Sequence, residues 1–358
     1  MSWDSKLYVV KLKTLSDKEY SKKLSLSEIE EYLDINSYSK KYDEYIESGL
    51  LYFTENLNTL AKNLNVDKIY PKGLYIMGIY GGEKKKGEEK YAGLVLEEYH
   101  EECSIFKFRL YNTKDILVVP KDYLKEYSVK VYKMIYVREI NPFRIIKYLD
   151  IILSEKNQKS LKNFLSKTLI LNERNISVET HSKVEKLINE LHQPSMIKPL
   201  SINKYYVVYR RIRAFTATVF KPTSDNFVIK DEVGYIECKN EEIAYYYSAI
   251  LNYLMYKVMK FKRTVTRTQY GRPILAIYIA GLSWNNIDEE TKKEIIELSK
   301  ELHKKAPLKK YSNQNKALEE ILQFPEFKKL IELLDSKVND EKIKEALTLV
   351  SGRGKKEK

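Results

Sequence analysis

A cluster of basic and hydrogen-bonding residues after residue 260 has the composition of a surface that contacts nucleic acid. Its basic members are Lys262, Arg263, Arg267 and Arg272. Three threonines and Gln269, Tyr270 and Gly271 lie between them. Guanidinium groups form bidentate contacts with phosphate or guanine, and a glycine lets the backbone approach closely. The segment therefore predicts a DNA contact. A solvated loop is the alternative.

Further basic residues lie upstream, in a window where acidic residues are few. We predict two strands in the segment 204–220, around three arginines, and a helix that ends at residue 260 with two lysines in its last turn. The predicted DNA-binding set is Arg210, Arg211, Arg213, Lys257, Lys260, Lys262, Arg263, Arg267, Gln269, Tyr270 and Arg272. We predict no catalytic residue and no metal ligand.

The helix that must position this set is predicted over residues 241–260. Asn240 is a favourable N-cap, and Glu241 and Glu242 place negative charge in the first turn. Apolar residues recur every three or four positions and predict one face packed on a core; they are Ile243, Tyr247, Ile250, Leu251, Leu254 and Val258.

Residues 200–306 resemble the target-recognition domain of adenine-specific DNA methyltransferases and of fused restriction–methylation enzymes. The matching segments are Tyr235-Ile236-Glu237-Cys238, Ala249-Ile250-Leu251-Asn252, Arg267–Arg272, Ile274–Ile279 and Glu289–Lys305. The resemblance implies a strand, an acidic helix start, a basic loop, a short apolar strand over Ile274–Ile279 and a final helix. It also implies double-stranded DNA as the ligand. The chain contains no catalytic methyltransferase module, so we expect no cofactor and no binding of S-adenosylmethionine.

Two other functions are compatible with the sequence. Glu237 and Lys239, with Asp225 or Asp231 upstream, have the composition of a metal-dependent nuclease strand, in which carboxylates bind the metal and a lysine polarises water. Glu-x-Lys triplets are frequent in so charged a chain, however. The second alternative is a protein–protein scaffold. The four histidines form no close pair that would suit a metal.

Composition limits the class of protein. The chain has 358 residues, a formal net charge of +13 and 43% hydrophobic residues, so it can form more than one core and favours an anionic partner. Nucleic acid is the first candidate, and an anionic membrane surface is the second. Cys103 and Cys238 are too few for a disulfide framework or a structural zinc site. No apolar run approaches the ~20 residues of a membrane span. We expect an intracellular protein whose composition suits a thermophile.

The periodicities predict an α+β, multi-domain fold. A mainly helical segment over 1–70, with a strand at 7–12, comes first. The segment 71–138 follows, with five predicted strands at 74–80, 91–99, 104–111, 116–119 and 128–137 that suggest a small SH3-like barrel. A helical connector follows over 139–199, with helices beginning at Asn141 and covering 158–171 and 177–191. The target-recognition-like module at 200–306 ends in a predicted helix at 288–305. Helices at 313–323, 325–336 and 339–349 are predicted within 307–350, and a disordered basic tail at 351–358.

These observations together predict a sequence-specific or structure-specific DNA-binding protein without its own catalysis. Its expected role is the specificity component of a restriction, modification or defence complex. The expected partners are double-stranded DNA and a methyltransferase, nuclease or other defence subunit. The expected location is the cytoplasm, on the nucleoid when bound to DNA.

Overall fold

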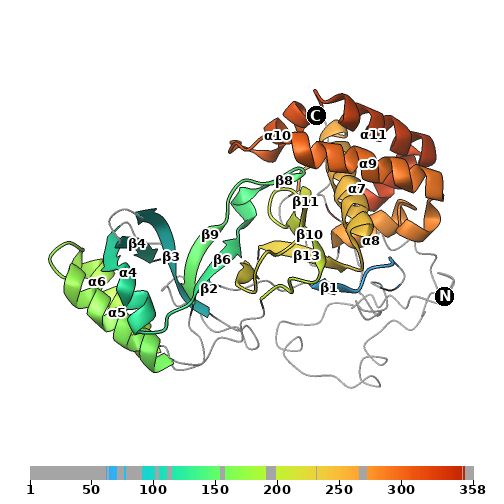
Figure 1. Cartoon of the computed structure of the whole chain (residues 1–358). Coiled ribbons are helices and arrows are strands. Elements are labelled where there is room, and N and C mark those ends of the chain that lie inside the picture. Colours follow the sequence, from blue (N-terminus) through green and yellow to red (C-terminus); the bar gives the residue numbers. More distant parts are fainter. Residues whose placement is uncertain are drawn as a thin grey trace, which may run out of the picture.

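The computed structural model describes residues 62, 64–70, 76–77, 91–100, 105–110, 115–153, 158–190, 199–230, 232–265, 272–348 and 350. The strand and helices predicted before residue 62, the loop predicted over 266–271 and the predicted C-terminal tail lie outside these residues. Strands and helices are both abundant, so the α+β class is confirmed (Figure 1). No helix in the described part of the chain is long and apolar enough to cross a membrane.

A four-stranded antiparallel sheet lies under the C-terminal helices. In spatial order its strands are β1 (Lys68–Tyr70), β13 (Val233–Cys238), β10 (Tyr205–Arg210) and β11 (Ala217–Phe220). β10 and β13 pair along six residues, from Tyr205 opposite Cys238 to Arg210 opposite Val233. Because β1 pairs with β13, a short segment from before residue 71 belongs to this sheet.

A second, seven-stranded sheet occupies the other half of the molecule. Its main path is β12 (Phe227–Ile229), β6 (Val131–Ile135), β9 (Leu149–Leu153), β3 (Tyr91–His100), β4 (Ile105–Leu110) and β5 (Ile116–Pro120), with β2 (Ile76–Met77) parallel to β3. The predicted strands at 91–99, 104–111, 116–119 and 128–137 are confirmed. The barrel is not, because the described strands form an open sheet. β12 pairs in parallel with β6 and extends this sheet instead of closing it.

The helix predicted to begin at Asn141 is wrong. A 3₁₀ turn, η1 (Val137–Glu139), leads into the two-stranded hairpin of β7 (Ile140–Asn141) and β8 (Arg144–Ile145), and β9 follows. The sequence of β9, LDIIL, falls within the segment that was predicted to be helical. In the sheet it lies between β6 and β3, where β-branched isoleucines are favourable.

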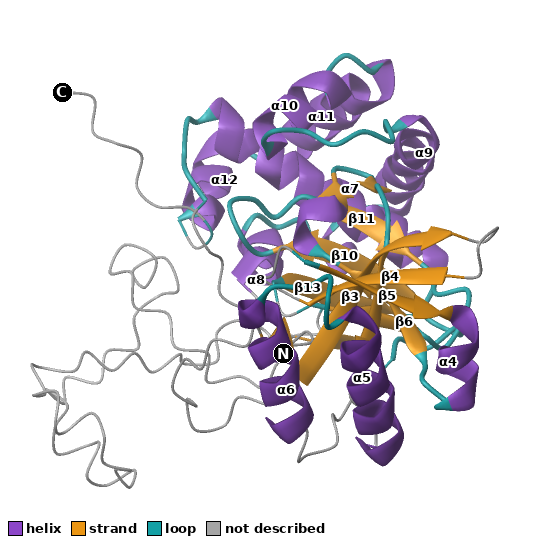
Figure 2. Ribbon diagram, turned by 90° about the vertical axis from the view of Figure 1, so that its left-hand side faces the viewer, coloured by secondary structure: helices purple, strands orange, loops and turns teal. Residues whose placement is uncertain are grey.

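Three helices accompany the seven-stranded sheet at the end of the molecule far from the C-terminal helices (Figure 1). They are α4 (Lys121–Glu126), α5 (Gln158–Asn172) and α6 (Val178–Glu190), and the last two match their predicted ranges closely. α5 packs Phe164 and Leu165 against Leu117 and Val119 of β5 in a small apolar core. α5 and α6 therefore cover one side of this sheet, as Figure 2 shows.

The C-terminal helices form the largest core with the four-stranded sheet. They are α7 (Glu241–Lys260), α8 (Arg272–Ile279), α9 (Glu289–Lys305), α10 (Gln314–Ile321), α11 (Pro325–Lys337) and α12 (Asp340–Leu347), with a 3₁₀ turn η2 (Trp284–Asn286). The predicted helices 288–305, 313–323, 325–336 and 339–349 are confirmed. The predicted strand Ile274–Ile279 is wrong: it forms α8, whose apolar residues are buried in this core, so it needs no strand partner.

The turn between β7 and β8 joins the two halves. Phe143 adopts a φ of +61°, is 1% exposed, and donates its backbone N–H to the Ala217 carbonyl at 2.9 Å. Its ring packs edge-on against His303 at 5.2 Å and Phe327 at 5.7 Å between centroids. The side chain of Asn141 donates to the Lys309 carbonyl at 2.9 Å. A turn from the segment predicted as a helical connector is thus inserted into the core of the helical half.

Candidate nucleic-acid interface

Helix α7 is the rigid element beneath the predicted DNA-binding residues. Asn240 caps it by accepting from the Ile243 N–H at 2.9 Å, as predicted. In its middle, Asn252 is fully buried and binds both backbone groups of Ala217, accepting from the N–H at 3.0 Å and donating to the carbonyl at 2.8 Å. The amide therefore clamps α7 to strand β11.

The direction of α7 follows from two of its contacts. Tyr247 donates its hydroxyl to the Leu64 carbonyl, beside the end of β13, whereas Asn252 lies at Ala217, which pairs with Tyr209 near the end of β10. α7 thus runs in the same direction as β10. Its last eight residues extend roughly 12 Å past Asn252, toward the side where the β10–β11 turn leaves the sheet.

The C-terminal end of α7 places lysines in a strained turn. Lys262 has a φ of +50° and donates its N–H to Met259 at 3.0 Å, and the Arg263 N–H reaches Val258 at 2.9 Å. These two bonds form a Schellman motif, whose left-handed position glycine normally occupies. Lys260 and Lys262 are exposed. A side chain other than glycine is strained here, and such outliers cluster at functional sites.

The turn between β10 and β11 carries a second strained cation. Arg213 has a φ of +61° and is exposed, whereas its neighbours Ala214 and Phe215 are buried in the main core. The turn is held by the Thr216 hydroxyl, which donates to the Gln314 side chain at 2.8 Å. Arg213 is therefore presented by a fixed backbone, on the side of the sheet toward which α7 runs.

Lys257 does not belong to this surface, contrary to the prediction. Its ammonium group is 1% exposed and lies 2.8 Å from carboxylate oxygens of both Asp335 and Asp340. Burial alone would lower the pKa of Lys257, but the hydrogen bonds to the two carboxylates raise it overall. The predicted point charge is thus neutralised within the protein, where it joins α7 to α11 and α12.

The pKa of Asp340 reflects the positive charges around it. The hydrogen bond from Lys257 lowers the pKa of Asp340, and the charges of Lys260 and Lys344 lower it further. Lys344 also lies 5.6 Å from the centre of the Phe261 ring, at the last turn of α7. Lys344 itself is paired with Glu341 at 2.6 Å, so its charge is balanced within α12.

Arg210 and Arg211 are likewise structural. Arg210 donates through Nη1 to the carbonyls of Val137 at 2.8 Å and Ile140 at 3.3 Å, which attaches the η1 turn to β10. Burial lowers the pKa of its guanidinium to about 10. Arg211 is 3% exposed. The internal contacts of Arg210 and the burial of Arg211 argue against the predicted DNA contacts of these two residues.

The loop that contains the remaining predicted residues is only partly described. Arg267, Gln269 and Tyr270 lie outside the described residues. Arg263 and Arg272, on either side of them, are half-buried, and burial lowers the pKa of each guanidinium. Both guanidinium groups are therefore partly shielded from solvent.

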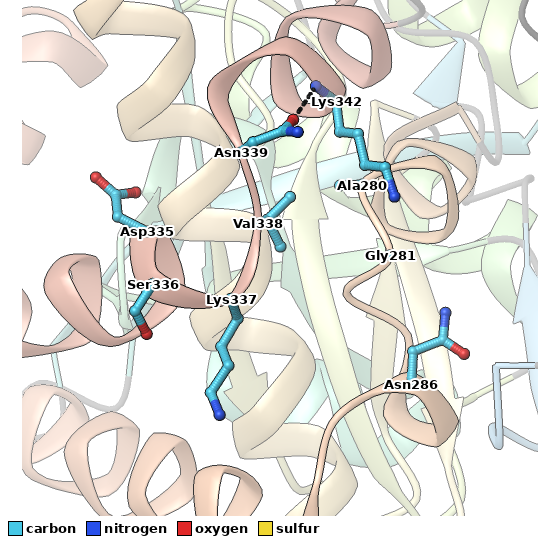
Figure 3. A pocket seen from close by; sticks show the side chains of 9 residues that line it. All are labelled: Ala280, Gly281, Asn286, Asp335, Ser336, Lys337, Val338, Asn339 and Lys342. Carbon is cyan, nitrogen blue, oxygen red and sulfur yellow. Dashed lines mark hydrogen bonds between the residues drawn. The ribbon is translucent and has the colours of Figure 1, made fainter.

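A shallow hollow of about 570 Å³ lies on the same helical half, between the end of α8 and the α11–α12 turn (Figure 3). Asp335, which binds Lys257, is part of its lining, and Lys342 extends across it toward Ala280. Lys337 in the same lining lies 2.9 Å from Asp288. No group of three or more His, Cys, Asp or Glu side chains in the described part of the chain could hold a metal ion.

The structure separates the residues of the nuclease alternative. Asp225 lies two residues before β12 of the seven-stranded sheet, and its carboxylate is 3.8 Å from the ammonium group of Lys130. Glu237 instead lies on β13 of the four-stranded sheet. Asp231 is outside the described residues. Lys239 donates to the Asn65 side chain at 3.3 Å.

A carboxylate that the sequence analysis missed lies beside Glu237. Asp67 hydrogen-bonds to Lys204 and raises its pKa, and Glu237 lies 3.6 Å from the same ammonium group. No local sequence signal links Asp67 to Glu237; the pairing of β1 with β13 brings them together. Lys204 already supplies a positive charge between the two carboxylates.

Comparisons with known proteins add no assignment: no family model matches the chain, and no curated protein matches it.

Proposed function

We propose that this protein binds duplex DNA through the C-terminal end of α7, the loop that follows it and the β10–β11 turn. In this proposal residues 200–306 act as a target-recognition-like module. The chain performs no chemistry of its own and serves as the specificity component of a restriction, modification or defence complex in the cytoplasm. A methyltransferase, nuclease or other defence subunit would supply catalysis.

The observation that carries the proposal is the contrast between paired and unpaired cations. On α9, Lys292, Lys300 and Lys304 each bind a glutamate three residues earlier. Arg213, Lys260 and Lys262, by contrast, are exposed and have no carboxylate partner within 4.0 Å among the described residues. Exposed cations on a rigid helix end and a fixed turn suit phosphate contacts, which position a protein on DNA.

Further support comes from the order of elements. A strand that ends at Cys238, the capped helix α7 and a basic loop follow one another as the resemblance to target-recognition domains implies. Sequence reading is assigned to Arg267, Gln269 and Arg272, because a loop between two packed helices can project side chains while its ends stay fixed.

The test is a gel-shift titration with duplex DNA at increasing salt. If the module contacts about six phosphates, affinity falls roughly a thousandfold between 50 and 200 mM salt, because bound cations are released from DNA on binding. Lys260→Ala should reduce the salt slope by about one unit and weaken binding to all sequences alike. Lys257→Ala, whose charge is internal, is the matched control and should leave the slope unchanged. A salt-independent affinity would refute the proposal.

Sequence reading requires a separate measurement. In a randomised-site selection, Arg267→Ala or Arg272→Ala should lower specific binding by about 1–3 kcal/mol and relax one or two base positions. Lys260→Ala should leave base preference unchanged. If the arginine variants and Lys260→Ala give the same base preference, the loop does not read sequence.

The nuclease alternative keeps one supporting observation, the proximity of Asp67 and Glu237 at Lys204. Incubation of the purified protein with DNA and Mg²⁺ or Mn²⁺ tests it directly. Cleavage that requires the metal ion and disappears in Glu237→Ala would replace the binding proposal. We expect the DNA to remain intact.

A further inference from the structure

The hollow between the end of α8 and the α11–α12 turn has the size of a small-molecule site. Its volume is about 570 Å³, and sites for small ligands usually measure roughly 300–1,000 Å³. We call it the α8 hollow. Gly281 in its lining has a φ of +72°, and a Cβ atom there would meet no other atom within 4 Å. The space above this backbone is therefore open, and a ligand can approach it closely.

Two of the three charged side chains in the lining are balanced by partners within the protein. Asp335 accepts a hydrogen bond from the Tyr253 hydroxyl at 2.6 Å and lies 2.8 Å from the ammonium group of Lys257. The ammonium group of Lys337 lies 2.9 Å from the carboxylate of Asp288. Neither charge therefore needs a ligand of the opposite sign.

Lys342 is the third charged side chain, and it is not balanced in this way. It is exposed and extends across the α8 hollow toward Ala280 (Figure 3). In the described part of the chain no carboxylate lies within 4.0 Å of its ammonium group, whereas Lys344 on the same helix pairs with Glu341 at 2.6 Å. The α8 hollow thus contains one cation without a counter-charge. An ammonium group is a suitable donor to phosphate or carboxylate oxygens.

The other polar side chains of the lining carry no charge. Asn339 accepts the Lys342 N–H through Oδ1 at 2.9 Å, so its amide group faces outward as a donor, and Asn286 contributes a second amide. The Ser336 hydroxyl donates to the Leu333 carbonyl at 2.7 Å and keeps its lone pairs for a donor from a ligand. These groups are complementary to the hydroxyl groups of a neutral, polar molecule.

We propose that the α8 hollow binds a small organic anion, in which a phosphate ester or a carboxylate contacts Lys342 and a neutral polar body contacts the amide and hydroxyl groups. An anionic oxygen group is the chemistry that both kinds of ligand share. None of the residues that line the hollow belongs to the proposed DNA-binding surface. The inference therefore does not rest on DNA binding.

Calorimetric titration of the full-length protein tests the proposal. The probes are glucose 6-phosphate, glucuronate and glucose, which share a neutral ring and differ in the group at one end. At least one of the two anions should bind saturably, with a Kd in the roughly millimolar range because a single ion contact anchors it. Glucose should not bind. The anion that binds more tightly distinguishes a phosphate site from a carboxylate site.

Variants at Lys342 locate the binding site. Lys342→Gln should weaken binding of the preferred anion roughly tenfold, because hydrogen bonds to charged groups are among the stronger ones. Lys342→Arg keeps the charge and should retain most of the affinity. Lys344→Gln is the matched control, since this lysine is on the same helix, does not line the hollow and is already paired. Circular dichroism confirms that each variant is folded.

Four outcomes would overturn the proposal. Neither anion binds saturably, or glucose binds as tightly as the anions, or Lys342→Gln leaves the affinity unchanged. In the fourth, duplex DNA displaces the bound anion, which would assign Lys342 to the nucleic-acid backbone. A protein that fails to shift DNA can still pass the first three tests, and one that shifts DNA can still fail them. The two proposals are therefore tested separately.

Discussion

Lys257 and Lys260 lie three residues apart on α7, and their surroundings assign them different roles. The buried Lys257 ammonium binds Asp335 and Asp340, whereas Lys260 is exposed. Lys257→Ala should destabilise the protein by about 1–3 kcal/mol, below the 3–5 kcal/mol of a fully buried pair, because both carboxylates retain contact with water. Lys260→Ala should change stability little and weaken DNA binding. Urea unfolding and gel shift of both variants give the comparison, and equal stability of the two would contradict it.

His303 makes the fold sensitive to acid. The Nε2 atom accepts a hydrogen bond from the Val219 N–H at 3.0 Å, and Nδ1 lies 2.7 Å from the Ser299 carbonyl. The ring is therefore neutral, because a proton on Nε2 would break the hydrogen bond from Val219. Burial lowers the pKa of His303 to about 4, and the residue as a whole is half-buried.

The sign of the pH dependence follows from that lowered pKa. Below about pH 6.5 this histidine is protonated in the unfolded chain but stays neutral in the folded chain. Folding stability therefore falls as the pH decreases toward 4. Between pH 7 and 5 the wild type should lose on the order of 1–2 kcal/mol more than His303→Gln. Urea unfolding at both pH values measures this difference. His181→Gln, which changes a half-buried histidine on α6, is the control, and a wild type that parallels His303→Gln would contradict the assignment.

At the scale of one element, the end of α7 combines backbone strain at Lys262 with the proposed DNA contact. Lys262→Gly should raise the free energy of unfolding by about 1 kcal/mol, because glycine adopts a positive φ without a Cβ clash. The same change should weaken DNA binding by removing a charge. Lys260→Gly is the matched control and should lower stability, since residue 260 is still helical. Chemical denaturation and gel shift would distinguish these effects, and a less stable Lys262→Gly would disprove the strain argument.

Strand β13 contains a second constraint that depends on one small residue. Gly234 lies opposite Tyr209, and a Cβ atom on Gly234 would come within 2.2 Å of the Tyr209 ring. Tyr209 is fully buried, so its ring has no free space to move into. Gly234→Ala should destabilise the protein by about 1–3 kcal/mol or more, as overpacking does. Thermal unfolding measures the loss, and the double variant with Tyr209→Leu should recover part of it.

At the scale of the whole molecule, Phe143 joins the two halves. The ring is enclosed by His303 and Phe327, and Arg144 next to it donates to the His303 carbonyl at 3.0 Å. Phe143→Ala should cost about 3–5 kcal/mol, because it leaves a cavity between elements from both halves. Hydrogen exchange should show the loss in β7, β8 and α9 together. Exchange that changes only in β7 and β8 would mean that the halves are held by other contacts.

Local signals in the sequence determined the helices and most strands. Asn240, which the sequence predicts as an N-cap, and Asp288, Asn313 and Asn339 cap their helices through side-chain oxygens. Each of these caps involves only residues within three positions of one another. Alternating apolar residues similarly identified β3 to β6. The basic composition after residue 260 likewise identified the candidate interface without any knowledge of the fold.

Only the tertiary structure decided which charges face solvent and how the strands pair. Lys257 meets Asp340 across 83 positions of sequence, and Arg210 meets Val137 across 73, so no local pattern could show that either charge is internal. The apolar runs of β9 and α8 are short enough to suit a strand or a helix, and their partners made the choice. The open sheet has the same cause: β12, distant in sequence, pairs with β6, because strand pairing follows which surfaces can be buried together.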